Sequence, residues 1–499
     1  MRGLGALAKL SLAGGWAALA CGDTPKADAL DTAPVTQDAT PAVPNEAQKP
    51  GSDGECAQVG RLEQPLSVVD RWLIGTPAQY PPDPALRPEL SALAASQRLR
   101  RERAWQIAER VLTPVALAGE LSPLVAAELP AFQTWHGRDD ITRIFRRLYA
   151  ELGEADRKRR ARFSPGALEA AWRWNDDAVA DFEAWTAERR ATYSEGIDDA
   201  SSAHGLGGLT RVTYSPAASQ HLLLSYPEVV ACREGRAHAP ADDAAASASS
   251  EGCGSQLRDP ACLADAFPPG AAIIKASFRR ADVTEPLDVY VTSSDALRTR
   301  MSSNEPSWER GDEQASPSES DAYTLELPNG NVYWLTGLHV MTKELDDWFW
   351  LSLWWSADPD SDFGADRPGS IPAPFNHYKL CSVVDFVEGD VDPTGGFDGD
   401  QRSLGDALAV MHEGPTGPTW CSNPYIEIEP GAAETSCIGC HQHAASGLSS
   451  TEIISDERAR PARSRARTLD RIDSDYVFGL STGEDLGSMF LETEQHFAP

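Results

Sequence analysis

The sequence predicts an α+β protein in which an N-terminal helical region precedes a mainly antiparallel β domain and a short C-terminal segment. Two observations support this order. Apolar residues recur at helical spacing as far as Tyr193, and from Ala271 apolar and polar residues alternate, with many β-branched and aromatic side chains. The 14 tryptophans and a hydrophobic fraction of 41% are ample for packed cores in a chain of 499 residues.

Changes in composition divide the chain into six parts. They are a signal peptide (1–21), a disordered tether (22–60), a helical region (61–233), a low-complexity insert (234–270), a β-rich domain (271–414) and a C-terminal segment (415–499). The tether is rich in Ala, Pro, Thr and Asp and has no apolar periodicity, which is typical of a flexible linker. We expect the insert to separate the helical region from the β-rich domain.

The N-terminus has the features of a secretory signal: Arg2 and Lys9, a short apolar run, and small residues before Cys21. The letters ALAC that end at Cys21 resemble a lipobox, which implies that this cysteine is lipidated. A signal cleaved without lipidation and an uncleaved helix are the alternatives, and the apolar run is short for a membrane span. We therefore expect an exported protein on the periplasmic or cell-surface side of a bacterial membrane.

Three helices are predicted between residues 91 and 193. The first ends at Pro114, and the second covers 139–152 and ends at Gly153. The third begins with Ser164 as its N-cap and Pro165 at the first helical position. We expect the tryptophans of the third helix to be core contacts.

Strands are predicted from the alternating segments between 271 and 387. These segments are AAIIKASFRR, LDVYVTS, AYTLELPNG, NVYWLTGLHVMT and DWFWLSLWWSA. The letters PNGN between the third and fourth segments are a hairpin signal. The β-rich domain is therefore expected to be mainly antiparallel sheet.

The most specific motif is SCIGCHQHA at 436–444. Two cysteines three positions apart, with a histidine directly after the second, form the pattern of c-type haem attachment, in which both thiols become thioethers and the imidazole binds iron. We therefore predict one covalent haem c at Cys437, Cys440 and His441, which makes 415–499 the haem c-binding segment. The alternatives are a chance CxxC, a redox dithiol, expected within a βαβ pattern, and a zinc site, which needs a second ligand pair.

Cysteine usage is typical of an oxidising compartment. Of nine cysteines, one is the candidate lipid site and two belong to the haem motif. The remaining six are Cys56, Cys232, Cys253, Cys262, Cys381 and Cys421. They allow up to three disulfides with 15 connectivities, and Cys253 with Cys262 is the most local candidate pair. Buried thiols are the alternative.

The chain is strongly acidic, with 44 basic and 75 acidic residues and a net charge of −31. Such a surface repels nucleic acid and anionic headgroups. We therefore expect no nucleic-acid partner and contact with the membrane only through the N-terminal anchor. The charge suits a basic redox partner protein, although a generally acidic surface for solubility explains it as well.

Several segments together resemble a group of bacterial mono-haem cytochrome c family proteins. They are IIKASFRR, WLTGLHVMTKELDDWFWLSLWW, the stretch from NPYIE to TSCIGCHQHA, and SDYVFGL, which span roughly 271–485. The resemblance implies haem c, and it matches the group's recurring residues at Lys275, His339, Lys343, Trp348 and Trp350. The group often has HIVHK where this chain has HVMTK, so a second histidine is absent here.

Function at such a haem depends on the other axial position, because a strong sixth ligand favours electron transfer and an open position permits small-molecule chemistry. His339, in a predicted strand, is the leading candidate for the sixth ligand. The alternatives are an open position or one of Met341, His377, His412 and Met489.

Other polar residues are candidates for contacts with the haem propionates. His443 is too close to His441 in sequence to reach the opposite side of the same iron, so a propionate is its expected partner. Lys275, Lys343 and Lys379 are candidates for the same role, with a solvated lysine as the alternative.

Two acidic stretches, at 358–366 and 388–400, place oxygen donors at alternate positions as calcium loops do. Neither has the glycine and glutamate positions of an EF-hand. We expect acidic turns there, with bound calcium as the alternative.

The expected function is that of an exported c-type cytochrome that binds one covalent haem and transfers single electrons. A peroxidase-like haem enzyme with an open distal site, and a ligand-binding or sensor lipoprotein with a structural haem, are the alternatives. The sequence contains no G-x-S-x-G, phosphate loop or HExxH motif, and no catalytic residues are predicted.

Overall fold

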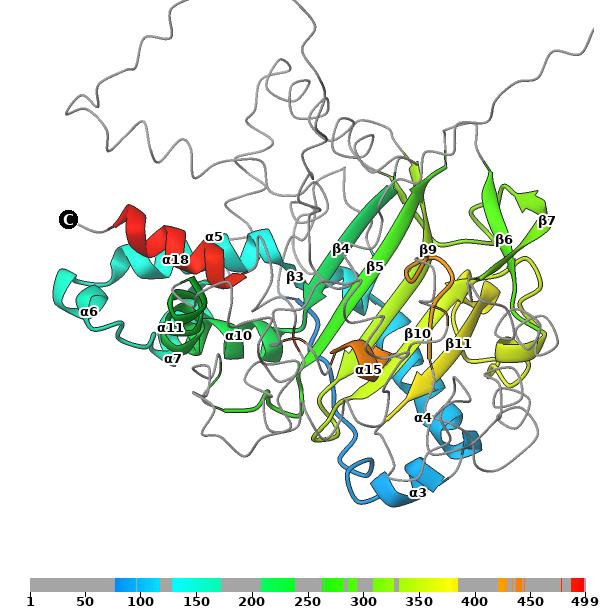
Figure 1. Ribbon diagram of the computed structural model, residues 1–499, viewed down its shortest axis with the longest axis horizontal. Coiled ribbons are helices and arrows are strands. Elements are labelled where there is room, and N and C mark those ends of the chain that lie inside the picture. Colours follow the sequence, from blue (N-terminus) through cyan, green and yellow to red (C-terminus); the bar gives the residue numbers. More distant parts are fainter. Residues whose placement is uncertain are drawn as a thin grey trace, which may run out of the picture.

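The computed structural model describes residues 77–95, 97–116, 128–171, 208–237, 263, 265–281, 286–293, 308–326, 332–384, 421–428, 433, 437–441, 444, 477 and 486–497. Its main sheet has the strand order β11-β10-β9-β5-β4-β3, with β8 paired to β9, and all neighbours are antiparallel. These strands are β3 (His136–Gly137), β4 (Gly208–Tyr214), β5 (Ala272–Arg280), β8 (Thr324–Glu326), β9 (Val332–Thr342), β10 (Phe349–Trp355) and β11 (Tyr378–Val383). The predicted α+β class with antiparallel sheet is confirmed for these residues (Figure 1).

Two strands of the main sheet come from the stretch predicted to be helical. β4 pairs with β5 from Gly208 opposite Arg279 to Tyr214 opposite Ile273, and β3 pairs with β4. A single strand of seven residues is stabilised mainly by its neighbours, so its local pattern is a weak signal. The sheet therefore extends beyond 271–414 and ties the N-terminal region to the β-rich domain.

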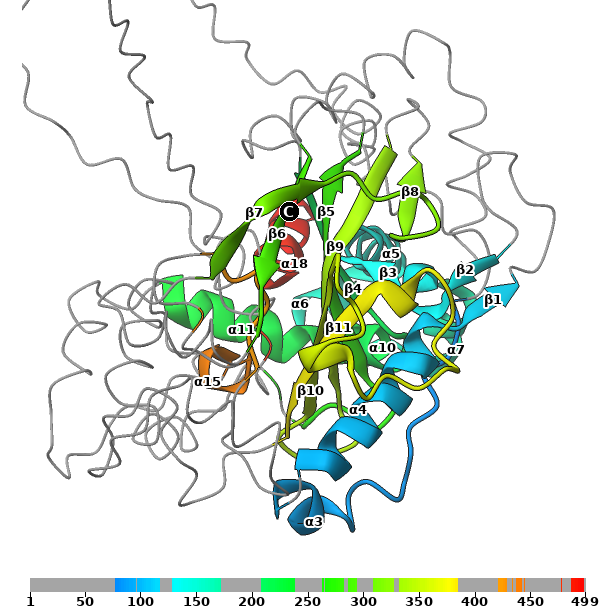
Figure 2. The same cartoon turned by 90° about the vertical axis from the view of Figure 1, so that its right-hand side faces the viewer.

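Alternation of side chains gives the main sheet two differently covered faces. One face carries Leu351 and Leu353 and is covered by helix α4 (Gln97–Leu112). The other face carries Trp350 and is covered by residues 421–428 and helix α15 (Cys437–His441). In Figure 2, where the sheet is seen nearly edge-on, α4 and α15 lie on opposite sides of it.

Helix α4 follows the shorter helix α3 (Leu90–Ala95) and ends before Pro114, as predicted. The predicted stop agrees with the loss of helical hydrogen bonding at proline. Pro114 instead begins β1 (Pro114–Ala116), which pairs with β2 (Glu128–Pro130). On the sheet side of α4, Arg101 binds Asp366 and donates to the carbonyls of Phe363 and Leu380.

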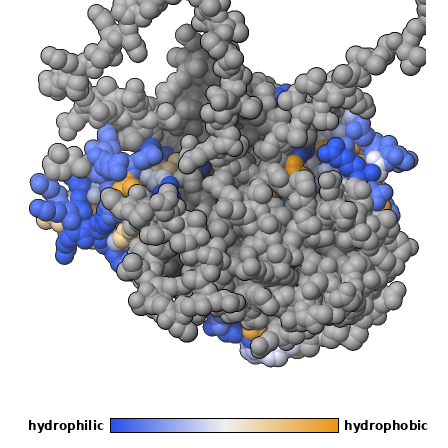
Figure 3. All heavy atoms as spheres, viewed as in Figure 1, coloured by the Kyte–Doolittle hydropathy of each residue, from blue (hydrophilic) through white to orange (hydrophobic). Residues whose placement is uncertain are grey.

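A second group of helices packs beside the sheet and includes the C-terminal helix. Its members are α5 (Arg138–Glu151), α6 (Glu154–Lys158), α7 (Pro165–Ala171), α10 (Pro216–Leu224), α11 (Tyr226–Ala237) and α18 (Leu486–His496). The ring of Phe145 joins them, because it lies 5.1 Å from Tyr226 and 4.1 Å from Phe490. Hydrophilic side chains cover this group at the left edge of Figure 3.

The predicted starts and ends of these helices are largely confirmed. α5 ends at Glu151, two residues before the predicted stop at Gly153. Ser164 caps α7, since its Oγ accepts a hydrogen bond from the amide of Ala167 at 3.1 Å. The tryptophans predicted to be core contacts, from Trp172 onward, lie outside the described residues.

The remaining described strands, β6 (Leu287–Val291) and β7 (Glu309–Ala315), form an antiparallel pair. The predicted signal peptide with Cys21, the tether, and the candidate pair Cys253 and Cys262 lie outside the described residues.

Among the helices that the structure describes, none combines the length and apolar character needed to cross a membrane.

Candidate functional site

The CxxCH motif forms a single helical turn, α15. Residues three and four positions apart in a helix share a face, so Cys440 and His441 lie on the same side as Cys437. Both motif cysteines are thiols, whereas Cys381 and Cys421 form a disulfide. The motif therefore presents two thiols and an imidazole together, the groups that covalent haem attachment uses.

Helix α15 lies on β10, and its histidine packs against the sheet. The ring of His441 contacts the indole of Trp350, with 4.6 Å between the centroids and 52° between the planes. Trp350 is 3% exposed, and its Nε1 donates to the carbonyl of Asp347 at 2.9 Å. The C-terminal segment is thus held against an aromatic strand.

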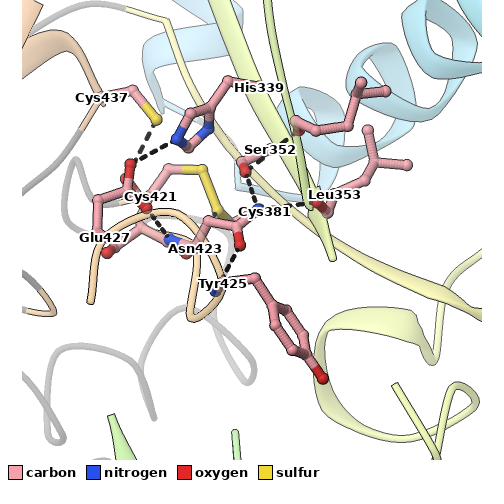
Figure 4. A network of polar contacts seen from close by, with 11 residues as sticks. His339, Ser352, Leu353, Cys381, Cys421, Asn423, Tyr425, Glu427 and Cys437 are labelled. Atoms are coloured by element: carbon pink, nitrogen blue, oxygen red, sulfur yellow. Dashed lines mark hydrogen bonds and ion pairs between the residues drawn. A yellow bond between two sulfur atoms is a disulfide. The ribbon is translucent and has the colours of Figure 1, made fainter. Parts of the chain in front are cut away.

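Residues 421–428 fasten the C-terminal segment to the same face of the sheet (Figure 4). Cys421 is joined to Cys381 of β11 by the disulfide. The side-chain amide of Asn423 donates to Ser352 Oγ and to the carbonyl of Leu353, both at 2.8 Å. One covalent bond and two hydrogen bonds therefore connect this short stretch to β10 and β11.

The same stretch passes very close to β9. A Cβ atom at Gly337 would lie 2.9 Å from Cγ1 of Ile426, nearer than side chains normally approach. On the other side, the hydroxyl of Tyr425 donates to the carbonyl of Asp288 in β6 at 2.7 Å. A larger residue at 337 would therefore require the side chains of this stretch, or the stretch itself, to shift.

One carbonyl connects this stretch to the haem motif. The carbonyl oxygen of Cys421 accepts hydrogen bonds from the amide of Cys437 at 3.0 Å and from its thiol at 3.3 Å. Burial, and to a lesser extent the negative charge of Glu427, raises the pKa of the Cys437 thiol well above its usual range. In this arrangement the thiol stays protonated at neutral pH and is a weak nucleophile.

His339 lies on the sheet face that α15 covers. In the register of the sheet it stands opposite Ser352 of β10 and Lys275 of β5. Its Nε2 lies 2.5 Å from Oε1 of Glu427, and the two side chains are 17% and 15% exposed. Its Nδ1 is buried and has no hydrogen-bond partner among the described residues.

This environment is typical of a metal-binding histidine, in which one ring nitrogen bonds a carboxylate and the other binds the metal. The described residues therefore fit a covalent haem: α15 supplies two thiols and His441, and the facing sheet supplies the buried Nδ1 of His339. His339 and His441, the two candidate iron ligands, thus lie on the same face of the sheet.

Two other candidate ligands occupy different parts of the sheet. Met341 stands directly opposite Trp350 and is 5% exposed, so it shares the face of His339. His377, in the turn η4 (Phe375–His377), lies beyond the far end of β10, where its carbonyl accepts from the amide of Ser356. Its ring is 3.8 Å from Asp321. Of these two, Met341 is therefore the alternative ligand that lies on the same sheet face as His339.

Met489 belongs to the helical group rather than to this face. It lies in α18, where its sulfur accepts a hydrogen bond from Thr142 Oγ1 of α5 at 3.1 Å. Figures 1 and 2 both show α18 apart from α15. His412 and His443 lie outside the described residues.

The three candidate propionate-binding lysines have different surroundings. Lys379 is buried and binds Asp362 at 3.3 Å as well as two hydroxyl groups. Lys343 donates to a loop carbonyl and lies 5.1 Å above the ring of Trp348. Lys275 is half-buried on the site face, opposite the candidate ligand in β9, and remains the best placed of the three.

The carboxylates of the first acidic stretch form ion pairs with basic side chains of the protein. These pairs join Asp360 to Arg367, Asp362 to Lys379, and Asp366 to Arg101. The three carboxylates thus have basic partners, an arrangement that suits a structural turn better than a calcium loop. The second stretch, 388–400, lies outside the described residues.

Sequence reasoning missed the residues that hold the C-terminal segment. The partnership of Cys381 with Cys421 was one of many connectivities that spacing leaves open. Asn423 and Glu427 both lie in NPYIE, a segment quoted above only for its resemblance. A short polar stretch that precedes a cofactor motif was the available signal.

Comparisons with protein-family models, with curated proteins and with solved structures give no match to this chain.

Proposed function

We propose that this protein is an exported c-type cytochrome that binds one haem covalently through Cys437 and Cys440 and transfers single electrons. One observation carries the proposal: α15 presents both thiols and His441 against a sheet face that also holds the buried Nδ1 of His339, which has no hydrogen-bond partner within the described part of the chain. When bound, haem c supplies a one-electron ferric/ferrous couple.

The residues around the site have distinct roles in this proposal. His441 and His339 would hold the haem iron. Trp350 is buried and packs against the ring of the half-buried His441, and solvent access is one of the factors that set a haem potential. Binding by two imidazoles would favour electron transfer over substrate chemistry.

Export is supported by the disulfide between Cys381 and Cys421, because disulfides persist in oxidising compartments. In the proposal, the signal at 1–21 directs the chain to the periplasmic or cell-surface side, and lipidated Cys21 with the tether holds the body near a bacterial membrane. The net charge of −31 suits a basic redox partner and disfavours nucleic acid.

A peroxidase-like enzyme is the second candidate, and the pair of His339 and Glu427 favours it. A histidine bonded to a carboxylate beside an open iron position can accept and return protons. The two candidates differ in one property: whether His339 binds the iron or stands away from it.

The test is an absorption spectrum of the full chain matured with haem, oxidised and reduced, with and without carbon monoxide. The expected result is a low-spin spectrum that carbon monoxide leaves unchanged, and His339→Ala should become sensitive to it. His377→Ala is the matched control and should retain the wild-type spectrum. A high-spin wild type that binds carbon monoxide would favour the enzyme, or a sensor with the same open iron.

Covalent attachment is tested separately. The double variant Cys437→Ser, Cys440→Ser should release all haem on denaturation, whereas the wild type should keep it attached to the polypeptide. A wild type that carries no covalent haem after expression with a c-type maturation system would contradict the proposed function.

A further inference from the structure

The contact between Glu427 and His339 gives the two nitrogens of the imidazole different roles. We propose that Glu427 is a positioning residue for the second axial ligand: its carboxylate accepts the proton of His339 Nε2 and leaves Nδ1 as the nitrogen that binds the iron. This inference rests on the proposed function, because it concerns the ligand of that haem.

The carboxylate is itself held in place. Its Oε2 accepts a hydrogen bond from the backbone amide of Asn423, and the amide of Glu427 donates to the carbonyl of Asn423 at 2.8 Å. The side chain of Asn423 is in turn bonded to Ser352 and Leu353 of β10. The chain of contacts therefore fixes Glu427 relative to the strands, so it can fix the ring of His339 as well.

The chemistry of the contact determines the tautomer. A carboxylate only accepts hydrogen bonds, so the nitrogen 2.5 Å from it, Nε2, must carry the proton. In a neutral imidazole the other nitrogen then has a free lone pair. That nitrogen, Nδ1, is the buried atom without a partner among the described residues.

The negative charge of Glu427 should also affect the reduction potential of the haem. A carboxylate hydrogen-bonded to a ligating imidazole makes the ligand more basic, and a nearby negative charge favours the more positive ferric state over the ferrous state. Glu427 is therefore expected to lower the reduction potential of the haem. A contact that served stability alone would have no such effect on the potential.

The first experiment needs no haem. Nitrogen-15 NMR of the full haem-free chain reports which ring nitrogen of each histidine carries a proton, and His339→Gln identifies the signal. The expected result is a protonated Nε2 and a bare Nδ1, and Glu427→Ala should mix the two tautomers. A proton on Nδ1 of His339 in the wild type would overturn the inference.

The second experiment uses the haem-loaded protein. Glu427→Gln keeps an oxygen acceptor but loses the charge, so the ferric spectrum should stay low-spin while the midpoint potential rises. Glu427→Ala loses both, so a high-spin fraction that binds carbon monoxide should appear. Glu151→Gln, at the exposed end of α5, makes the same charge change as Glu427→Gln and should alter neither property.

The outcomes separate the two proposals. Covalent haem with wild-type spectrum and potential in both Glu427 variants would overturn the role of Glu427 and leave the cytochrome assignment standing. Absence of covalent haem in the wild type would overturn the proposed function, while the NMR result would still decide the tautomer.

Discussion

The two faces of the main sheet are packed by different kinds of side chain. Under α4, the strands contribute aliphatic residues such as Leu351, Leu353 and Val340, which are at most 1% exposed. Under residues 421–428 and α15, the matching positions include His339 and Ser352, and they are bonded to polar groups of the C-terminal segment.

The aliphatic face therefore serves mainly to stabilise the fold, whereas the polar face meets the requirements of the candidate site. Apolar burial stabilises a sheet without further conditions, whereas each buried polar group costs free energy unless it is bonded. Departures from simple packing are expected where a protein functions. The polar face, where Nδ1 of His339 has no partner among the residues that the structure describes, is such a departure. Changes on the two faces should therefore have different consequences.

The largest expected effect is on stability and comes from the α4 face. Leu351→Ala removes a fully buried side chain and should lower the free energy of unfolding by about 3–5 kcal/mol, through lost burial and the cavity left behind. Urea denaturation measures the loss. The haem spectrum of the folded fraction should not change, and a change of iron ligation there would break the separation between the faces.

Removing the disulfide on the site face should affect both the stability of the fold and the haem spectrum. Cys381→Ser with Cys421→Ser removes a cross-link between residues 40 positions apart and should cost about 2–4 kcal/mol. Because the carbonyl of Cys421 holds Cys437, the haem spectrum should also become heterogeneous.

Cys232 provides the control for this change, since it is also disulfide-bonded but lies in α11 of the helical group. Cys232→Ser should lower stability and leave the haem spectrum as it is. Equal spectral changes in both variants would show that stability alone, and not the hold on α15, determines the site.

Much of the α4 face could be predicted from the sequence, because its signals are local. The helix that ends before Pro114 and the alternation in β5, β9 and β10 follow from short-range patterns. β4 escaped prediction because its seven residues gain stability only from β5, which lies beyond an insert.

The candidate site also has residues that could be predicted from the sequence and residues that could not. The spacing of the CxxCH motif predicts Cys437, Cys440 and His441 as haem-binding residues, and His339 was the leading candidate for the sixth ligand; both stay predictions, and the structure places His339 and His441 on one sheet face. The partners Asn423 and Glu427 could not be predicted, because their contacts depend on how a loop crosses three strands. Such tertiary contacts leave no periodic pattern in a single sequence.

A smaller effect is expected where the C-terminal segment crosses β9. Gly337→Ala places a Cβ against Ile426, so the loop must shift, at a cost of about 1–3 kcal/mol. Gly153→Ala is the matched control, because nothing lies within 4 Å of a Cβ there and φ is −64°. It should be neutral or slightly stabilising. Equal stability of both variants in urea denaturation would show that the loop adapts freely.

The smallest expected effect comes from the Cys437 thiol in the haem-free chain. Burial, with a contribution from Glu427, raises its folded pKa above its unfolded value of about 8.5. The folded state therefore favours the neutral thiol, and this contribution is complete below the unfolded pKa and is lost as pH rises toward the folded pKa.

The haem-free wild type should therefore lose stability above about pH 8.5, by at most about 1.4 kcal/mol per pH unit. Cys437→Ser, whose hydroxyl does not titrate there, should lack this part of the slope, and unfolding curves at pH 7 and about pH 9.5 measure the difference. Parallel slopes would place the thiol in water rather than under residues 421–428. A thioether does not titrate either, so haem attachment should remove the same part of the slope.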